Sequence, residues 1–287
     1  MKVLSTAEEI NREVLQLRKE DKSVGFVPTL GALHEGHCAL FRRAAKENDV
    51  TVASIYVNAQ QFDSETDAEA YPRDFERDKK LAAESGVNVI FHPDDAEMYP
   101  PGNATQVVSN SSVTRCYEGA IRPNFFAGVI TVVSKLLNAV PADRVYFGQK
   151  DLQQYIVVSR MVEDLLFQQE IVPVQVIRDE NGIAYSSRNQ GLDESGWETA
   201  QEVYEIMRSI KEEAAELSRQ KLFSRYVPRL EEAGFDLQYL DVVRFPHYDP
   251  AWPGDRDAVV ILAGYAGDVR LKDNLPLHVE DVAKLEQ

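Results

Sequence analysis

The sequence predicts an α/β protein with a larger N-terminal domain, built on a parallel sheet, and a smaller α+β domain after it. Two apolar runs, residues 24–27 and 50–57, predict buried strands, and the second is rich in β-branched residues, as strands covered on both faces are. A helical pattern over residues 35–47 separates the two runs. From about residue 190 the pattern changes to two helical stretches followed by strands, which predicts the second domain.

The remaining elements are expected along the chain in order. Further helices of the first domain are expected at residues 6–20, 74–85 (closed by Gly86) and 128–140, and in the segment that carries Gln153 and Gln154. Its further strands are expected at residues 87–91, 145–147 and 171–177. Residues 93–127 show no clean period, and a loop of that length is usually functional or mobile. The second domain is expected to have helices at 193–217 and 220–233, and strands near 238–243 and 258–263.

The composition is that of a folded, acidic protein. Of the 287 residues, 44% are hydrophobic and 27% are charged, which is enough apolar material for a packed core. A formal net charge of −16 argues against nucleic acid as a partner, because phosphate contacts need a basic surface. No apolar run approaches the length of a membrane span, and the N-terminus does not resemble a signal peptide. Because the two cysteines, Cys38 and Cys116, belong to no motif, we expect a cytoplasmic location.

The stretch from residue 24 to residue 40 carries the first functional signal. Pro28 stops the apolar run, a turn follows through Leu30, and then His34, Gly36 and His37 open a helical pattern. The first turn of a helix has unsatisfied N–H groups and the positive end of the dipole, so it suits a phosphate. Two imidazoles three residues apart lie on one face of that turn and could donate to the same anion, while Gly36 leaves room against the backbone.

Other interpretations of the two histidines stay open at this point. Two histidines at this spacing are often a surface pair or part of a metal site. A zinc site would need a third ligand, and the other histidines, His92, His247 and His278, stand in no ligand spacing.

Polar side chains follow several predicted strands, where ligands bind in open parallel sheets. Asn58 and Gln61 follow the second strand, and their amides suit hydroxyls and carboxylates, although amide-rich loops are also frequent. Arg122, in the long loop, could pair with a carboxylate or be an ordinary exposed arginine.

Two further segments suit phosphate groups. Gly148 and Lys150 form a glycine turn with a lysine at the carboxyl end of a predicted strand, where the lysine supplies a compact charge. The two hydroxyls and the guanidinium of Ser186, Ser187 and Arg188 together suit a polyphosphate.

Taken together, these strings resemble the pantothenate synthetase (pantoate–β-alanine ligase) family of the HIGH-motif nucleotidyltransferase superfamily. The matching strings, in the family's order, are PTLGALHEGH, NAQQF, YPR, FGQKDLQQ, RDENGIAYSSRN and RLKDN. The resemblance implies a Rossmann-like domain over residues 1–176 and a C-terminal lid domain over residues 177–287, commonly in a homodimer. It also implies ATP and Mg²⁺, with pantoate and β-alanine condensed through a pantoyl adenylate.

The resemblance also implies roles for individual residues. His34, His37 and Lys150 are expected to be catalytic. Contacts with ATP are expected from Leu30, His34, Gly36, His37, Gly148, Lys150, Asp151, Ser186, Ser187 and Arg188. Contacts with pantoate are expected from Asn58, Gln61, Arg122 and Gln154. Asp78 stands where the family keeps an acid near the metal, which it could contact through water.

Four positions depart from the family pattern. Leu30 and Tyr185 stand in place of methionines, and Ala59 stands in place of a proline. Phe125 replaces a histidine, which removes a donor and an acceptor beside the expected acyl or amine pocket. A related ligase with a different amine or hydroxy acid therefore stays open as an alternative. A nucleotidyltransferase that stops at an adenylylated product, and a non-catalytic binding protein, are the alternatives from other classes.

Overall fold

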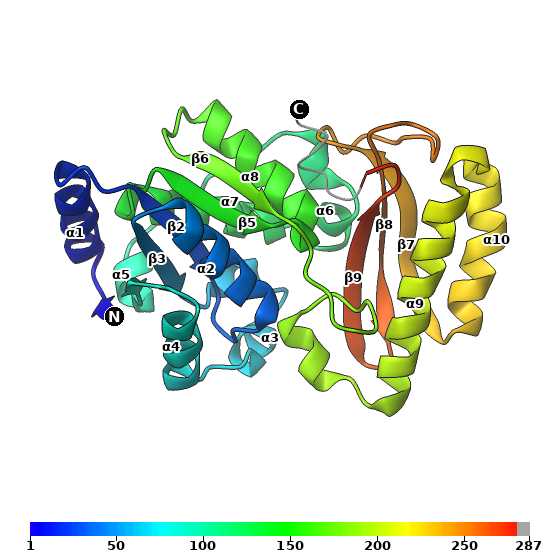
Figure 1. Ribbon diagram of the computed structural model, residues 1–287, viewed down its shortest axis with the longest axis horizontal. Helices are drawn as coiled ribbons and strands as arrows, with labels where there is room; N and C mark the ends of the chain where they lie inside the picture. The colour runs from blue at the N-terminus through cyan, green and yellow to red at the C-terminus, as the bar shows by residue number, and fades with distance from the viewer. Residues whose placement is uncertain (280–287) are drawn as a thin grey trace. The chain divides into compact units, whose positions relative to one another are not determined.

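The computed structural model describes residues 1–279 and divides the chain into two compact units (Figure 1). The first unit consists of Met1–Gly148 and Gln153–Val174; the second consists of Gln149–Leu152 and the chain from Gln175 onward. The short segment Gln149–Leu152, which the sequence places within the first domain, therefore belongs to the second unit. Among the described residues, no helix is both long and apolar enough to span a membrane.

The first unit contains the parallel sheet that the sequence predicts. Its strands, in spatial order, are β1 (Lys2–Leu4), β4 (Val89–Phe91), β3 (Val50–Ile55), β2 (Val24–Thr29), β5 (Arg144–Gly148) and β6 (Glu170–Val174). Every neighbouring pair is parallel. From β2 the strand order runs outward through β3 and β4 on one side and through β5 and β6 on the other. Ligands bind in such sheets beyond the carboxyl ends of the strands at this switch point.

The helices of the first unit begin and end close to the expected positions. They are α1 (Ala7–Lys19), α2 (Glu35–Glu47), α4 (Phe75–Glu84), α7 (Phe125–Ala139) and α8 (Leu152–Asp164). Local chemistry explains several ends: Asp74 caps the start of α4, and Gly86, with a φ of +95°, follows its end. The expected helix at 128–140 begins three residues earlier, at Phe125.

The stretch 93–127 is not one irregular loop, because short helical turns interrupt it. They are α5 (Asp95–Met98), η2 (Ser112–Arg115) and α6 (Glu118–Ile121). Two more short elements lie earlier in the unit: η1 (Ala59–Gln61) and α3 (Glu65–Ala70). Elements of three to six residues are too short to show a period, which is why the sequence pattern misses them.

The second unit is the expected α+β domain. Its antiparallel sheet has the order β7 (Phe235–Arg244), β8 (Ala258–Ala266) and β9 (Val269–Pro276). Two helices, α9 (Glu194–Glu213) and α10 (Arg219–Glu232), pack against this sheet (Figure 1). The short turns η3 (Gln149–Asp151), η4 (Ser187–Gly191) and η5 (Ala214–Glu216) complete it. The sequence analysis did not anticipate β9, which contains the RLKDN string.

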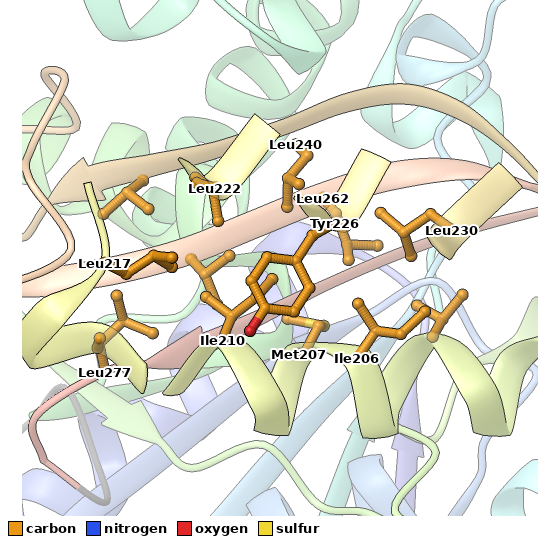
Figure 2. Packing of buried hydrophobic residues seen from close by; sticks show 14 of the residues in the cluster. Ile206, Met207, Ile210, Leu217, Leu222, Tyr226, Leu230, Leu240, Leu262 and Leu277 are labelled. Carbon is orange, nitrogen blue, oxygen red and sulfur yellow. The ribbon is translucent and has the colours of Figure 1, made fainter. Parts of the chain in front are cut away.

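The core of the second unit lies between its helices and its sheet. Figure 2 shows Tyr226 of α10 among Ile206, Met207 and Ile210 of α9, with Leu240 of the sheet near by. Tyr226 and the three α9 side chains are fully buried. Burying an aliphatic side chain of this size stabilises a fold by about 1.5–3 kcal/mol. The second unit therefore has a core of its own.

Candidate active site

The turn after β2 has an unusual backbone that a hydroxyl and a glycine make possible. Gly31 has a φ of +81° and Ala32 a φ of +48°, so the chain turns sharply through the left-handed region. The Thr29 hydroxyl donates to the carbonyl of Ser54 (2.7 Å) and accepts from the N–H of Gly31 (3.2 Å). This turn brings the chain from the end of β2 to the start of α2.

Asp78 of α4 holds the same turn from the other side. Its Oδ2 accepts from the N–H of Ala32 and its Oδ1 from the N–H of Leu33, both at 2.8 Å. Asp78 is only 1% exposed, and this burial raises the pKa of its carboxyl group above the usual value. Asp78 is therefore not a solvated helix residue, and both of its oxygens are engaged with backbone.

His34 and His37 lie together at the start of α2, where each ring binds the backbone of the first turn. His34 is the N-cap residue; its Nδ1 accepts from the N–H of Gly36 (3.2 Å). The Nδ1 of His37 accepts from the N–H of His34 (3.3 Å), and the ring centroids are 4.1 Å apart. Because Nδ1 is the acceptor in both rings, a neutral ring carries its proton on Nε2. The capping box therefore selects the tautomer that makes both Nε2 atoms donors.

Asn58 and Gln61, at the end of β3, are brought into direct contact. Asn58 is fully buried and its Nδ2 donates to the Oε1 of Gln61 (3.1 Å) and to the carbonyl of Gly128 (3.2 Å). Its Oδ1 accepts from the hydroxyl of Tyr99 (2.9 Å). All of the amide groups of Asn58 are thus engaged within the protein, whereas Gln61 is only partly buried.

Arg122 lies beside the same amides and is not an ordinary exposed arginine. Its Nε contacts both oxygens of Asp63 (2.9 and 2.7 Å), and its Nη2 donates to the carbonyl of Gln61 (3.0 Å). The ring of Phe125 lies 4.1 Å from the guanidinium carbon and is 7% exposed. The phenylalanine that departs from the family pattern therefore stacks on Arg122.

The two glutamines of α8 differ in their surroundings. Gln154, the residue expected to contact pantoate, is partly exposed. Gln153 is 4% exposed; its Nε2 donates to the carbonyls of Val113 and Cys116 (2.7 and 2.8 Å), and its Oε1 accepts from the N–H of Glu118 (3.2 Å). Gln153 therefore holds the segment that leads to Arg122.

In the second unit, Lys150 stands in the turn η3. Its ammonium has no hydrogen bond or ion pair with any residue from 1 to 279. Desolvation lowers the pKa of Lys150, with the Asp151 charge opposing that shift. Asp151 is itself paired with Lys272 (2.7 Å). A desolvated lysine without a carboxylate on its nitrogen is suited to an incoming anion.

Strand β9 holds the backbone of this turn. The Nδ2 of Asn274 donates to the carbonyls of Gln149 and Lys150 (2.9 and 3.0 Å), and Asn274 is 4% exposed. The preceding Asp273 binds Arg178 with both oxygens (2.5 and 2.9 Å). Asn274 of the RLKDN string thus fixes the backbone of the turn that contains Lys150.

Replacing Asn274 with aspartate is expected to destabilise the protein by about 2–4 kcal/mol, because a carboxylate would face two carbonyl oxygens in a buried place. Urea unfolding measures the loss. Asn181→Asp is the matched control, since Asn181 is exposed in a turn. Equal unfolding midpoints for the two variants would show that the contacts of Asn274 do not contribute to the free energy of unfolding.

The SSRN segment follows a turn that Arg178 also holds. The Nη1 of Arg178 donates to the carbonyl of Gly182 (3.0 Å). Ser186 is the N-cap residue of η4, its hydroxyl accepting from the N–H of Arg188 (3.3 Å). Arg188 is exposed, whereas Ser186 and Ser187 are partly buried.

Three residues that support these groups were given no role by the sequence analysis: Tyr99, Gln153 and Arg178. Each has contacts with residues at least 35 positions away in the chain, and Arg178 also has a local contact with Gly182. A local pattern carries no information about contacts at such separations. Gln153 stands next to Gln154 in a matching string, and Arg178 opens the segment that contains SSRN; these positions were the available signals.

Known proteins resemble this chain along nearly its whole length. A sequence model of the family described as pantoate-beta-alanine ligase matches residues 2–276. The chain is 40% identical to a pantothenate synthetase of Thermotoga petrophila over 280 residues, covering 96% of this chain and 99% of the relative. It is 41% identical to the Pseudomonas putida KT2440 pantothenate synthetase over 287 residues, covering 98% and 99%.

Solved structures give the same result. A pantothenate synthetase of Thermus thermophilus superposes with a TM-score of 0.88 at 40% identity, covering 97% of this chain and 100% of that one. A Francisella tularensis pantoate-beta-alanine ligase, described as complexed with beta-gamma ATP and beta-alanine, has a TM-score of 0.84 at 31% identity, covering 97% and 98%. The chain therefore belongs to the pantoate–β-alanine ligase family.

Proposed function

We propose that this chain condenses pantoate with β-alanine through a pantoyl adenylate, releasing pyrophosphate in the first step and AMP in the second. The observation that carries the proposal is the histidine pair at the start of α2. Both Nδ1 atoms accept backbone N–H groups, so both Nε2 atoms are donors at the N-terminus of a helix. Aligned donors of this kind stabilise the negative charge that gathers on phosphate in the transition state.

Two groups of residues are proposed to contact ATP. In the first unit, His34 and His37 donate to phosphate oxygens. The backbone at Leu30, Gly36 and Gly148 lies against the nucleotide. In the second unit, the ammonium of Lys150 and the groups of Ser186, Ser187 and Arg188 meet phosphate oxygens, with Asp151 beside them. The desolvation of the Lys150 ammonium, which has no partner within residues 1–279, supports its assignment.

We propose that Mg²⁺ arrives at this site with ATP. Among residues 1–279 no three acidic, histidine or cysteine side chains are grouped as metal ligands. Mg²⁺ commonly keeps several waters and binds substrate phosphates, where it neutralises part of their charge. Asp78, whose oxygens already accept two backbone N–H groups, could reach such an ion through water; this role stays a prediction.

Pantoate is proposed to bind beside Gln61 and Arg122, which lie within hydrogen-bond distance of each other. Gln154 and Asn58 complete the proposed set. The pantoate carboxylate attacks the α-phosphate of ATP, so no side chain has to act as the nucleophile. The amine of β-alanine then attacks the acyl carbon, and AMP leaves. Positioning of the reactants supplies much of the acceleration in such a reaction.

The test is AMP release by the purified protein with ATP, Mg²⁺ and pantoate, with β-alanine present or omitted. AMP together with pantothenate, formed only when β-alanine is present, is the expected result. Pantoate-dependent pyrophosphate exchange without pantothenate would support adenylation of pantoate and contradict β-alanine as the amine. Other amines would then be assayed. Absence of exchange with pantoate would contradict the proposal for the acid, and Phe125→His would then be the first variant to assay.

A homodimer in the cytoplasm and a lid role for the second unit also belong to this proposal. They rest on the resemblance to the family. Light scattering on the purified protein tests the dimer, for which a mass of twice the 32.4 kDa chain is expected; a mass of one chain would contradict it.

A further inference from the structure

The orientation of the Asn58 amide is fixed by its surroundings. The carbonyl of Gly128 can only accept, so the atom of Asn58 that faces it must be Nδ2. The Oδ1 then faces the Tyr99 hydroxyl, which must donate its proton. Gly128 lies close enough for this because it has no side chain: a Cβ there would be 2.3 Å from the carbonyl oxygen of Gln60.

The orientation of Asn58 in turn fixes that of Gln61. The second Nδ2 proton of Asn58 points to Gln61, so Gln61 must offer its oxygen there. The Nε2 of Gln61 is then the branch that remains for other partners, and it can only donate. A substrate group that meets Gln61 through this branch must be an acceptor, such as a carboxylate or hydroxyl oxygen.

We propose that Tyr99 is a positioning residue for the acid substrate. Its hydroxyl holds the Asn58 amide, and Asn58 in turn orients Gln61 so that the Nε2 of Gln61 is available to donate to the substrate. This inference rests on the proposed function, in which Gln61 contacts pantoate. Tyr99 follows the last turn of α5, and the ammonium of Lys135 lies over its ring, 4.5 Å from the ring centroid. That ammonium also binds the carbonyl of Met98 (2.6 Å), so ring and backbone are both held. Desolvation raises the pKa of Tyr99 to about 12, and the hydroxyl stays a donor over the working pH range.

The test replaces Tyr99 with phenylalanine, which keeps the ring under Lys135 and removes only the hydroxyl. Pantoate-dependent pyrophosphate exchange gives kcat and KM for each substrate. The KM for pantoate is expected to rise about tenfold, the effect of one lost hydrogen bond, while the KM for ATP stays unchanged. Tyr56→Phe is the matched control, because it removes a neighbouring hydroxyl that donates to the Asp95 carboxylate (2.8 Å) and not to an amide.

A second measurement asks whether Tyr99 acts through Gln61. In a Gln61→Ala background, Tyr99→Phe is expected to change kcat/KM for pantoate by less than about twofold, since coupled residues are not additive. Additive losses, a pantoate KM unchanged in Tyr99→Phe, or an equal rise in Tyr56→Phe would each overturn the inference. Absence of pantoate-dependent exchange in the unsubstituted protein would instead contradict the proposed function, so the two failures are distinguishable.

Discussion

Replacing Lys150 with methionine is expected to abolish pantoate-dependent pyrophosphate exchange and to leave the protein at least as stable as before. The ammonium has no partner among residues 1–279, and desolvation lowers its pKa, so the folded state holds this charge at a cost. An apolar side chain of similar length removes that cost. The exchange rate is expected to fall by about 10²–10³-fold or more, as when one donor to the transition state is removed.

Two assays measure this result: pyrophosphate exchange and urea unfolding. Lys221→Met is the matched control, because it removes the same charge from an exposed position of the second unit. Exchange at the normal rate in Lys150→Met would remove Lys150 from the proposed mechanism. A large loss of stability in that variant would mean that the lysine serves the fold instead.

The lowered pKa of Lys150 also predicts a pH dependence with a definite sign. Between the lowered folded pKa and the ordinary value of about 10.4, the unfolded chain binds more protons than the folded one. The contribution of this lysine to the free energy of unfolding therefore rises as pH rises through that window. The stability advantage of Lys150→Met should shrink over the same range, which urea unfolding at a series of alkaline pH values measures. A constant difference would contradict the desolvation of the charge.

Replacing Asp78 with asparagine is expected to lower the free energy of unfolding by about 2–4 kcal/mol, although the two side chains have nearly the same size. Asp78 accepts from the N–H groups of Ala32 and Leu33, which are 3% and 0% exposed. An asparagine would turn an NH₂ group toward one of them, so a buried donor would lose its acceptor. Chemical denaturation measures the change.

Asp74→Asn, on the same helix, is the control for this variant. Asp74 is the N-cap of α4, and asparagine caps a helix about as well, so stability should hardly change. If both variants unfold at the same denaturant concentration, the turn does not depend on Asp78. A water-mediated contact with Mg²⁺ predicts a further effect: Asp78→Asn would raise the Mg²⁺ concentration for half-maximal rate more than it raises the KM for ATP.

The local patterns of the chain were sufficient for its regular elements and for the chemistry of its strings. The helix expected at 35–47 has these bounds, and the strands at β2 and β3 begin where apolar runs begin. Amphipathic period, caps and β-branched runs act over a few residues, so they can be read without a structure. The family strings likewise need only their own residues.

The supporting contacts could be decided only by tertiary structure. Asp78 meets Leu33 from 45 positions away, Tyr99 meets Asn58 from 41, and Asn274 meets Lys150 from 124. Strand β9 gives too weak an alternation to predict, yet it holds the turn of Lys150. Side-chain types show which groups can donate or accept, but burial and the direction of an amide depend on which segments the fold packs together. For that reason the sequence indicated Asn58 and Gln61 as a pair, and the packing of Tyr99 and Gly128 around Asn58 set the direction of their amides.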